Sequence, residues 1–234
     1  MQWCEVMLEG CGQLAALLRS PVYRDGSVRG GAGKPVLLIP GLFAGDWTLL
    51  VLAGWLRRLG YQLYLSGLDW NVVHPSQTGQ WLKRRLAYIV QETGQPVTII
   101  GHSLGGMLGR FLSFEMPGHV THVIALGSPV YSPLAAYTPE SRDTIFPSQA
   151  EWETTQRQAV RRRPAHDLLV FLQRVFAPLP PDVRFTAIFS KQDEVVNWRA
   201  CIDPDGESRE VSGRHLSLVV NRGVYTALAE VLAA

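Results

Sequence analysis

The chain has 234 residues, of which 47% are hydrophobic and 18% charged, and its formal net charge is +2. This mixture is typical of a globular protein and excludes a disordered chain, while the near-balanced charge gives no reason to expect a nucleic-acid partner. The longest apolar stretch, residues 47–56, is far shorter than the ~20 residues that a transmembrane segment needs. The length suits one domain, so we expect residues 1–234 to form a single unit, whose oligomeric state the sequence does not fix.

The first residues carry no basic start ahead of an apolar run and no small-residue cleavage site, so a secretory signal peptide is not expected. Residues 1–20 predict a helix packed on the outside of the protein. On such a helix Cys4 and Cys11 would lie ~10 Å apart by helical rise, too far to form a disulfide, and Cys201 has no evident partner. Three free thiols indicate a reducing compartment, and we expect a cytoplasmic protein.

From Pro35 onward, apolar runs alternate regularly with amphipathic stretches. The predicted strands are residues 36–39, 61–65, the run that ends at Gly101, 122–126, 184–189 and 207–211. The predicted helices are residues 46–59, 78–93, the stretch between Ser103 and Pro117, and 224–232. Asp46 is placed to cap the first of these helices. The alternation predicts an α/β fold, with a mostly parallel sheet and helices on both faces.

The alternation breaks between Pro129 and Asp182, in a stretch rich in proline, arginine and aromatic residues. We expect residues 130–181 to form a helical lid or cap insertion above the sheet, with helices near 148–162 and 165–176. Its apolar side chains either face a pocket or merely cover the sheet. The three arginines at 161–163 form either a solvated face or a surface that attracts an anionic acyl carrier.

The most informative stretch is Pro96 to Gly109, with the sequence PVTIIGHSLGGMLG. An apolar, β-branched run ends in Gly101-His102-Ser103-Leu104-Gly105, and an amphipathic helix follows. A G-x-S-x-G sequence between a strand and a helix is the context in which a serine hydroxyl is exposed as a nucleophile. Glycine is needed because the strained turn leaves no room for side chains two residues to either side of the serine. Ser103 is therefore the candidate nucleophile.

A serine hydroxyl needs a base to take its proton, and the base needs an acid that fixes its tautomer. In open parallel sheets such groups gather beyond the carboxyl ends of the strands. Asp193 directly follows the predicted strand at 184–189, and His215 follows the one at 207–211. We therefore predict a triad of Ser103, His215 and Asp193, whose order along the chain is the one expected of this architecture.

Other residues could take the role of acid or base. The alternative acids are Glu194, which should point away from Asp193, and Asp203 and Asp205, which we expect to be solvated in a turn. The alternative bases are His102, locked beside the nucleophile, His119 and His122, which suit surface or packing roles, and His166 in the insertion. The competing interpretation of His215 is that of a surface histidine.

The tetrahedral intermediate needs two donors for its oxyanion. One is the backbone N–H of Leu104, at a helix start whose dipole favours negative charge. The other should come from the Pro40–Gly45 loop, where Gly41 lets the backbone turn inward and the N–H of Leu42 is the natural donor, with Phe43 as the alternative. The candidates for substrate binding are Phe43, His74 and Met107. No convincing His/Asp cluster for a metal is present in the sequence.

These residues together resemble the α/β-hydrolase superfamily. The resemblance rests on Pro40-Gly41-Leu42, Gly101 to Gly105, Gly127-Ser128-Pro129, Asp193 and His215, and extends over about residues 33–232. The chain is most similar to the bacterial lipase/esterase group with a Pro-Gly oxyanion loop and to class 2 triacylglycerol lipases. This resemblance implies a Ser-His-Asp acyl hydrolase that needs no cofactor. Many such lipases are secreted, so the lack of an expected export signal argues against triglyceride digestion.

The expected reaction is hydrolysis of a small apolar acyl ester or thioester through an acyl-enzyme. A second hypothesis keeps the acyl-enzyme and changes the acceptor, which gives an acyltransferase, cyclase or thioesterase of specialised metabolism. A third is a ligand-binding receptor on a hydrolase scaffold, with slow or absent turnover. Acyl length and leaving group do not follow from the residues.

Overall fold

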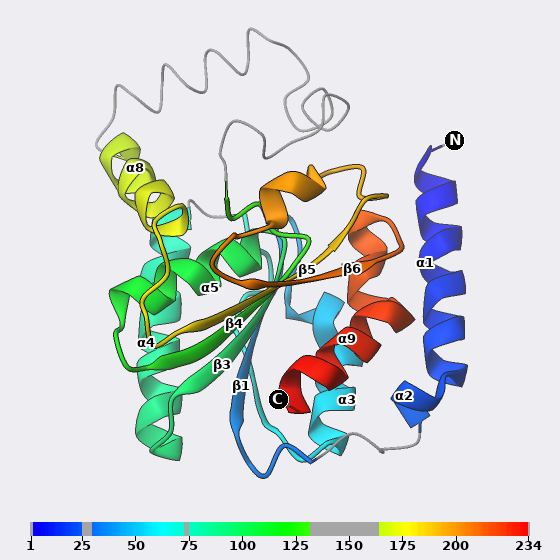
Figure 1. The fold of residues 1–234 in the computed structure, drawn as a ribbon, viewed down its shortest axis with the longest axis horizontal. Coiled ribbons are helices and arrows are strands. Elements are labelled where there is room, and N and C mark those ends of the chain that lie inside the picture. Colours follow the sequence, from blue (N-terminus) through cyan, green and yellow to red (C-terminus); the bar gives the residue numbers. More distant parts are fainter. Residues whose placement is uncertain (1, 25–29, 73–74, 132–163, 234) are drawn as a thin grey trace, which may run out of the picture.

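The computed structural model describes residues 2–24, 30–72, 75–131 and 164–233. Within these residues lies a six-stranded sheet made of β1 (Pro35–Ile39), β2 (Gln62–Leu65), β3 (Val97–His102), β4 (Val120–Leu126), β5 (Arg184–Ser190) and β6 (Glu207–Val211). The strands lie in the order β2-β1-β3-β4-β5-β6, and every neighbouring pair is parallel. The expected parallel sheet is confirmed, and all carboxyl ends therefore lie along one edge (Figure 1).

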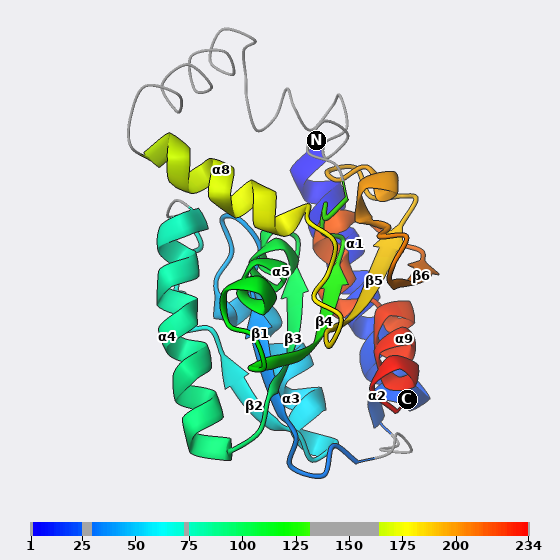
Figure 2. The same ribbon diagram turned by 60° about the vertical axis from the view of Figure 1, so that its left-hand side comes forward.

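Helices cover both faces of this sheet (Figures 1 and 2). One face carries α3 (Leu50–Arg58) and α9 (Arg222–Ala233), with α1 (Gln2–Arg19) and α2 (Pro21–Arg24) outside them. The other face carries α4 (Pro75–Thr93), α5 (Leu104–Glu115) and α8 (Pro164–Val175). Short 3-10 helices follow β1, β5 and β6, namely η1 (Asp46–Leu49), η2 (Trp198–Cys201) and η3 (His215–Val220).

Each helical layer forms its own apolar core against the sheet. On the α3 and α9 side, the buried rings of Trp55 and Tyr225 lie 4.9 Å apart. On the α5 side, Phe111 packs against Phe171 of α8 with ring centroids 5.4 Å apart. Strands β1, β3, β4 and β5 are buried almost throughout. Continuous burial explains why these strands consist of apolar runs rather than alternating residues.

Strand β6 differs from these four strands, because it forms one edge of the described sheet and none of its side chains is fully buried. Its glutamates are paired with nearby cations. Glu207 lies 3.6 Å from Arg184 and 3.1 Å from Arg209, and Glu210 lies 2.8 Å from Lys191. Charged side chains are typical of natural edge strands, since they discourage pairing with another chain.

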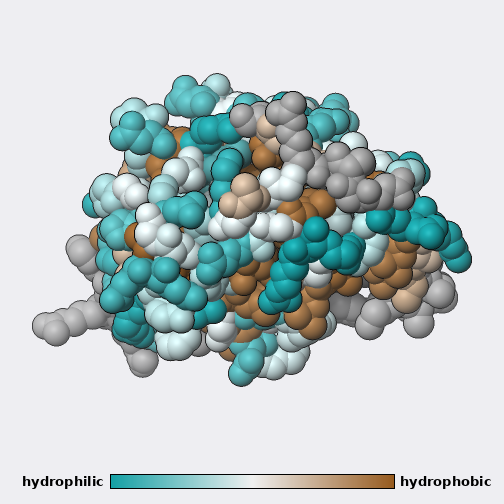
Figure 3. All heavy atoms as spheres, turned by 90° about the horizontal axis from the view of Figure 1, so that it is seen from below, coloured by the Kyte–Doolittle hydropathy of each residue, from teal (hydrophilic) through white to brown (hydrophobic). Residues whose placement is uncertain are grey.

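The end of the molecule where the strands begin is seen from below in Figure 3. Hydrophilic residues cover much of this face, and hydrophobic residues show between them. No helix among the described residues is long and apolar enough to cross a membrane.

The helix expected at 46–59 begins differently from the prediction. The structure has η1 followed by α3, and Gly45, rather than Asp46, precedes the first turn without a side-chain cap. The Asp46 carboxylate instead accepts hydrogen bonds from the Ser66 N–H (3.2 Å), the Ser66 hydroxyl (2.6 Å) and the Gly67 N–H (2.7 Å). The predicted cap was wrong because donors from the loop after β2 take this carboxylate.

Arg110 of α5 is a buried cation that joins three segments. Its guanidinium forms an ion pair with Asp203 and donates hydrogen bonds to the carbonyls of Val175 and Ala177, each at 2.7 Å. Asp203 is only 6% exposed, so the prediction of a solvated aspartate was wrong there, whereas Asp205 is exposed. Asp203 is buried because the buried Arg110 guanidinium needs a counter-charge. The turn sequence at residues 203–206 gives no sign of this distant partner.

The expected insertion at 130–181 is described only at its two ends. Helix α8 corresponds to the helix expected at 165–176, and it packs on the sheet side through the buried Phe171 and Val175 while Leu169 stays exposed. Residues 132–163 lie outside the described residues, and with them the helix expected at 148–162 and the arginines at 161–163. His74 lies outside them as well.

Candidate active site

Ser103 lies between β3 and α5 with φ 53° and ψ −120°, a conformation that side-chain-bearing residues seldom adopt. Its N–H donates a hydrogen bond to the Leu126 carbonyl at the end of β4 (2.9 Å). A Cβ on Gly101 would lie 2.2 Å from the carbonyl carbon of Gly105, and a Cβ on Gly105 would lie 2.1 Å from the Ile39 oxygen. Both positions therefore require glycine, and the surrounding backbone holds the strained turn in place.

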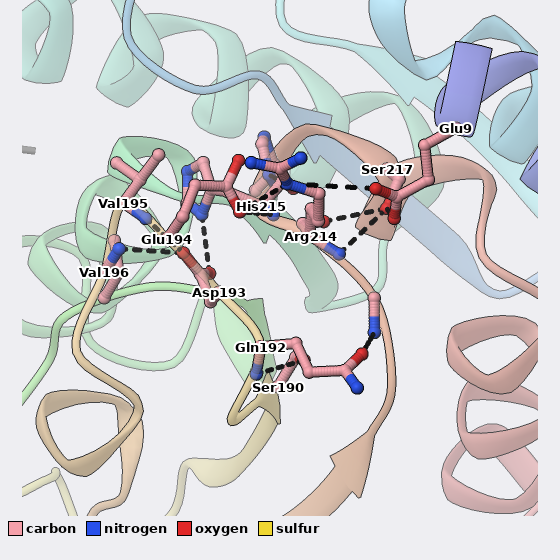
Figure 4. Close-up of polar contacts among 12 residues, drawn as sticks. Glu9, Ser190, Gln192, Asp193, Glu194, Val195, Val196, Arg214, His215 and Ser217 are labelled. Atoms are coloured by element: carbon pink, nitrogen blue, oxygen red, sulfur yellow. Dashed lines mark hydrogen bonds and ion pairs between the residues drawn. The ribbon is translucent and has the colours of Figure 1, made fainter. Parts of the chain in front are cut away.

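His215 and Asp193 form a buried pair beyond the ends of β6 and β5. Asp193 Oδ2 lies 2.7 Å from His215 Nδ1, and their side chains are 1% and 5% exposed. The other carboxylate oxygen, Oδ1, accepts hydrogen bonds from the N–H groups of Val195 (2.9 Å) and Val196 (2.8 Å). Figure 4 shows the Asp193 carboxylate between these amides and the imidazole. The arrangement places the proton of a neutral His215 on Nδ1 and leaves Nε2 free to act as a base.

The Asp193–His215 pair lies beside the turn that carries Ser103. A Cβ on Gly127, at the end of β4, would lie 3.1 Å from Asp193 Oδ2 and 3.4 Å from His215 Nδ1. The carbonyl of the preceding residue, Leu126, accepts the hydrogen bond from the Ser103 N–H. Among the described residues, no hydrogen bond joins the Ser103 hydroxyl to His215. Such bonds are often long before substrate binds and shorten in the complex.

The main chain of His215 is held by two further side chains. Its N–H donates to Glu194 Oε2 (3.1 Å), and its carbonyl lies 3.1 Å from His102 Nε2. Burial, and then the nearby His215, lowers the pKa of His102 to about 3. His102 is therefore neutral at neutral pH, and a proton on its Nε2 can be donated to the His215 carbonyl. The two alternative catalytic residues, Glu194 and His102, thus contact the backbone of His215 in this structure.

Two of the other histidines have partners elsewhere. His122 is buried on β4 with Nε2 2.9 Å from the Thr186 hydroxyl, and burial, followed by the charge of Arg184, lowers its pKa to about 4. His119 is half-buried, and its ring lies 3.0 Å from the Pro117 carbonyl. These positions agree with packing and surface roles.

The loop after β1 lies against the serine. A Cβ on Gly41 would lie 3.1 Å from the Ser103 Cβ. The Phe43 N–H already donates to the Asn71 carbonyl (3.0 Å), so this alternative oxyanion donor is engaged. No hydrogen bond from the amide of Leu42 or of Leu104 is found among the described residues, so both N–H groups are available as donors.

Asn71 supports this loop, and sequence reasoning did not identify it. Its Nδ2 donates to the Pro40 carbonyl (3.0 Å), and its N–H donates to the Ala44 carbonyl (2.7 Å). Together with the bond from Phe43, these contacts fasten both ends of the loop to the segment after β2. The only signal in the sequence is an asparagine in a loop, and that alone does not indicate a long-range contact.

Apolar side chains are exposed on the loop and the 3-10 helix η1 that follow β1, and on the loop that follows β2. They are Leu42, Phe43, Trp47, Trp70 and Val72, and the rings of Trp47 and Trp70 lie 5.9 Å apart. Contiguous exposed apolar groups often mark a binding surface. Met107, another predicted substrate contact, is only 7% exposed and packs in the core on the α5 side. No grouping of His, Cys, Asp or Glu suited to a metal ion occurs within the described part of the chain.

A family model described as the alpha/beta hydrolase fold matches residues 34–176, more than half of the chain. The match contains the loop after β1 and Ser103, and it ends before Asp193 and His215. No curated protein matches the chain in sequence.

Several solved structures are similar in fold. A carboxylesterase from the thaumarchaeon Nitrososphaera gargenis is 17% identical, with 87% of this chain and 91% of that chain covered and a TM-score of 0.56. A lipase-esterase related protein from Clostridium acetobutylicum is 12% identical, with coverages of 86% and 93% and a TM-score of 0.58. The mature lipase BlEst2 of Bacillus licheniformis is 14% identical, with coverages of 87% and 93% and a TM-score of 0.57. The chain belongs to the α/β-hydrolase fold family.

Proposed function

We propose that this chain is a serine hydrolase that cleaves the carboxylic ester of a small apolar acyl compound. The observation that carries the proposal is the buried 2.7 Å contact between Asp193 and His215, next to a serine in a strained strand-to-helix turn. A nucleophile, a base and an acid that orients the base are the three parts that acyl transfer to serine requires.

In this reaction His215 Nε2 takes the proton of Ser103 as the hydroxyl oxygen attacks the ester carbonyl. Asp193 stabilises the imidazolium that forms. The N–H groups of Leu42 and Leu104 donate to the oxyanion, and the dipole of α5 favours the negative charge at its first residue. His215 then returns the proton to the leaving alcohol, and water releases the acyl group by the same sequence.

Two observations support an ester of apolar character as the substrate. Structures of similar fold include a carboxylesterase and a lipase. Exposed apolar side chains, among them Leu42 and Phe43, lie on the proposed oxyanion loop. An acyl chain bound there would be next to the carbonyl that Ser103 attacks.

The experiment compares wild type and Ser103→Ala on p-nitrophenyl esters of graded acyl length and on acyl-thioesters. We expect Ser103→Ala to lower turnover by about 10⁴–10⁶-fold, because the three parts act as a unit. Ser208→Ala, on the exposed edge strand, is the matched control and should retain wild-type turnover. A fluorophosphonate should label wild type at Ser103.

Each contrary result has a defined meaning. Turnover in Ser103→Ala within about tenfold of wild type would overturn the mechanism. Transfer of the acyl group to an added alcohol or amine in preference to water would identify an acyltransferase. Absence of both turnover and labelling would favour a binding protein on a hydrolase scaffold.

A further inference from the structure

Glu194 directly follows Asp193 in the sequence but contacts a different part of His215. Asp193 contacts the imidazole, whereas Glu194 Oε2 accepts the main-chain N–H of His215 at 3.1 Å. The carbonyl of the same residue lies 3.1 Å from His102 Nε2. His215 is therefore held at its ring and at both main-chain polar groups, with two of these three contacts supplied by consecutive residues after β5.

The Glu194 carboxylate is itself oriented by a neighbouring cation. Arg214 Nε lies 3.6 Å from Glu194 Oε2 and 3.8 Å from Glu9 Oε2, which belongs to α1. The Ser217 hydroxyl lies 3.5 Å from the other Glu9 oxygen. Figure 4 shows this row of side chains beside His215, at the start of η3. The row connects the outermost helix with the main chain of the proposed base.

The contacts in this row differ in strength. The N–H of His215 bonds to an ionised oxygen, and hydrogen bonds of that kind are about twice as strong as neutral ones. The two ion pairs are longer and join side chains about one-third exposed, 30–32% in each case. Exposed pairs of that kind contribute little. Within this row, Glu194 is therefore the residue whose loss should most affect the main chain of His215, and Arg214 mainly holds the Glu194 carboxylate in place.

The position of the imidazole depends on the main chain from which it extends. The contact with Asp193 fixes the ring at Nδ1, but Nε2 reaches Ser103 only if the Cα of His215 is also in place. Misplacement by about 1 Å can cost about 10²-fold in rate. We propose that Glu194 is a positioning residue, which holds the main chain of His215 so that Nε2 is aligned with the Ser103 hydroxyl; this inference rests on the proposed function.

The charges around His215 give a second expected effect of Glu194. Among the residues that the structure describes, the charged groups that face His215 are Asp193 and Glu194, which are negative, and Arg214, which is positive, while His102 is neutral. Removal of the Glu194 charge makes the surroundings more positive and disfavours the imidazolium. The acidic limb of the kcat/KM profile should then move to lower pH.

The experiment compares Glu194→Ala and Glu194→Gln with Glu210→Ala in p-nitrophenyl ester hydrolysis. Glu210 is the matched control, because it is a glutamate in an ion pair with Lys191 (2.8 Å) on the edge strand. We expect Glu194→Ala to lower kcat by about 10–100-fold with KM within about twofold. Glu194→Gln keeps an oxygen that can accept the His215 N–H, so it should recover most of this loss, while both variants shift the acidic limb.

A readout without turnover is the NMR titration of the His215 Cε1–H signal, which Glu194→Gln should move to lower pH and Glu210→Ala should leave unchanged. An unchanged titration and an unchanged kcat in Glu194→Ala would overturn the inference. So would equal losses in the Ala and Gln variants with no shift of the pH profile, since that pattern indicates structural damage. If Ser103→Ala is inactive and Glu194→Ala resembles wild type, only this inference fails; if wild type neither turns over nor labels, the proposed function fails and the NMR titration still tests the contact.

Discussion

Asp193 has both carboxylate oxygens occupied, one by two backbone amides and the other by His215 Nδ1. The side chain therefore cannot rotate without losing several hydrogen bonds. An asparagine at this position would have to keep its oxygen toward the N–H groups of Val195 and Val196. Its NH₂ group would then face His215 Nδ1 and force the proton of the imidazole onto Nε2, where a base needs a lone pair.

We therefore expect Asp193→Asn to fold normally but, on the proposed mechanism, to lose on the order of 10⁴-fold in kcat, the loss that a wrong histidine tautomer causes in a serine protease. The measurement is p-nitrophenyl ester turnover at neutral pH, together with thermal melting to confirm the fold. Asp205→Asn, an exposed aspartate in the loop before β6, is the control. Turnover of Asp193→Asn close to that of wild type would mean that another acid orients His215.

At the scale of elements, Arg110 holds helix α5 to the end of α8 and to the loop before β6. The cation and its partner Asp203 are both buried, and the guanidinium also satisfies the carbonyls of Val175 and Ala177. A buried ion pair of this kind stabilises the fold little more than a pair of apolar side chains of similar volume would. Loss of only one partner, however, leaves a buried charge without compensation. The junction therefore matters most when only one side of it is changed.

Arg110→Ala should lower the free energy of unfolding by about 3–5 kcal/mol, because Asp203 is left buried without a cation. Guanidinium-induced unfolding measures this change. Arg209→Ala removes an exposed arginine that pairs with Glu207 at 3.1 Å, and its effect should stay below about 1 kcal/mol. A loss as small in Arg110→Ala as in Arg209→Ala would show that Asp203 finds water or another donor.

The sequence correctly predicted those elements whose formation depends on residues within the same segment. Strands such as β1 and β5 are buried on both faces, so each is an apolar run, and the glycines around Ser103 mark the turn directly. Asp46 and Asn71 were misassigned or missed because their partners come from segments that are distant in the sequence. The 3-10 helices η2 and η3 were not predicted, because segments of 4 and 6 residues are too short to show an apolar period.

At the scale of the whole molecule, two buried histidines tie stability to pH. Burial is the main cause that lowers the pKa of His102 to about 3 and that of His122 to about 4, below the ordinary value of 6.5. As the pH falls below 6.5, the unfolded chain takes up protons that the folded chain does not. The stabilisation is fully present above pH 6.5 and is lost as the pH falls toward these lower pKa values, by about 1.4 kcal/mol per pH unit for each histidine.

His122→Gln should therefore weaken the pH dependence of stability. It keeps a polar group for Thr186, and it removes the proton uptake of one histidine in the unfolded state. Between pH 7 and pH 4.5, the free energy of unfolding of the variant should fall by roughly 2–3 kcal/mol less than that of wild type. Urea unfolding at the two pH values measures this, with His119→Gln, at a histidine that is only half-buried, as the control. Parallel pH curves for wild type and His122→Gln would contradict the assignment.

The exposed edge of the sheet has a consequence for the proposed base. Strand β6 ends at Val211, four residues before His215, so a strand added by a second chain would lie beside the loop that leads to η3 and the imidazole. An added strand would desolvate Glu207, Arg209 and Glu210, whose side chains are roughly half exposed. Burial of unmatched charge opposes that step. Crowding of many copies of the protein should therefore leave the loop, and with it the alignment of the imidazole, undisturbed.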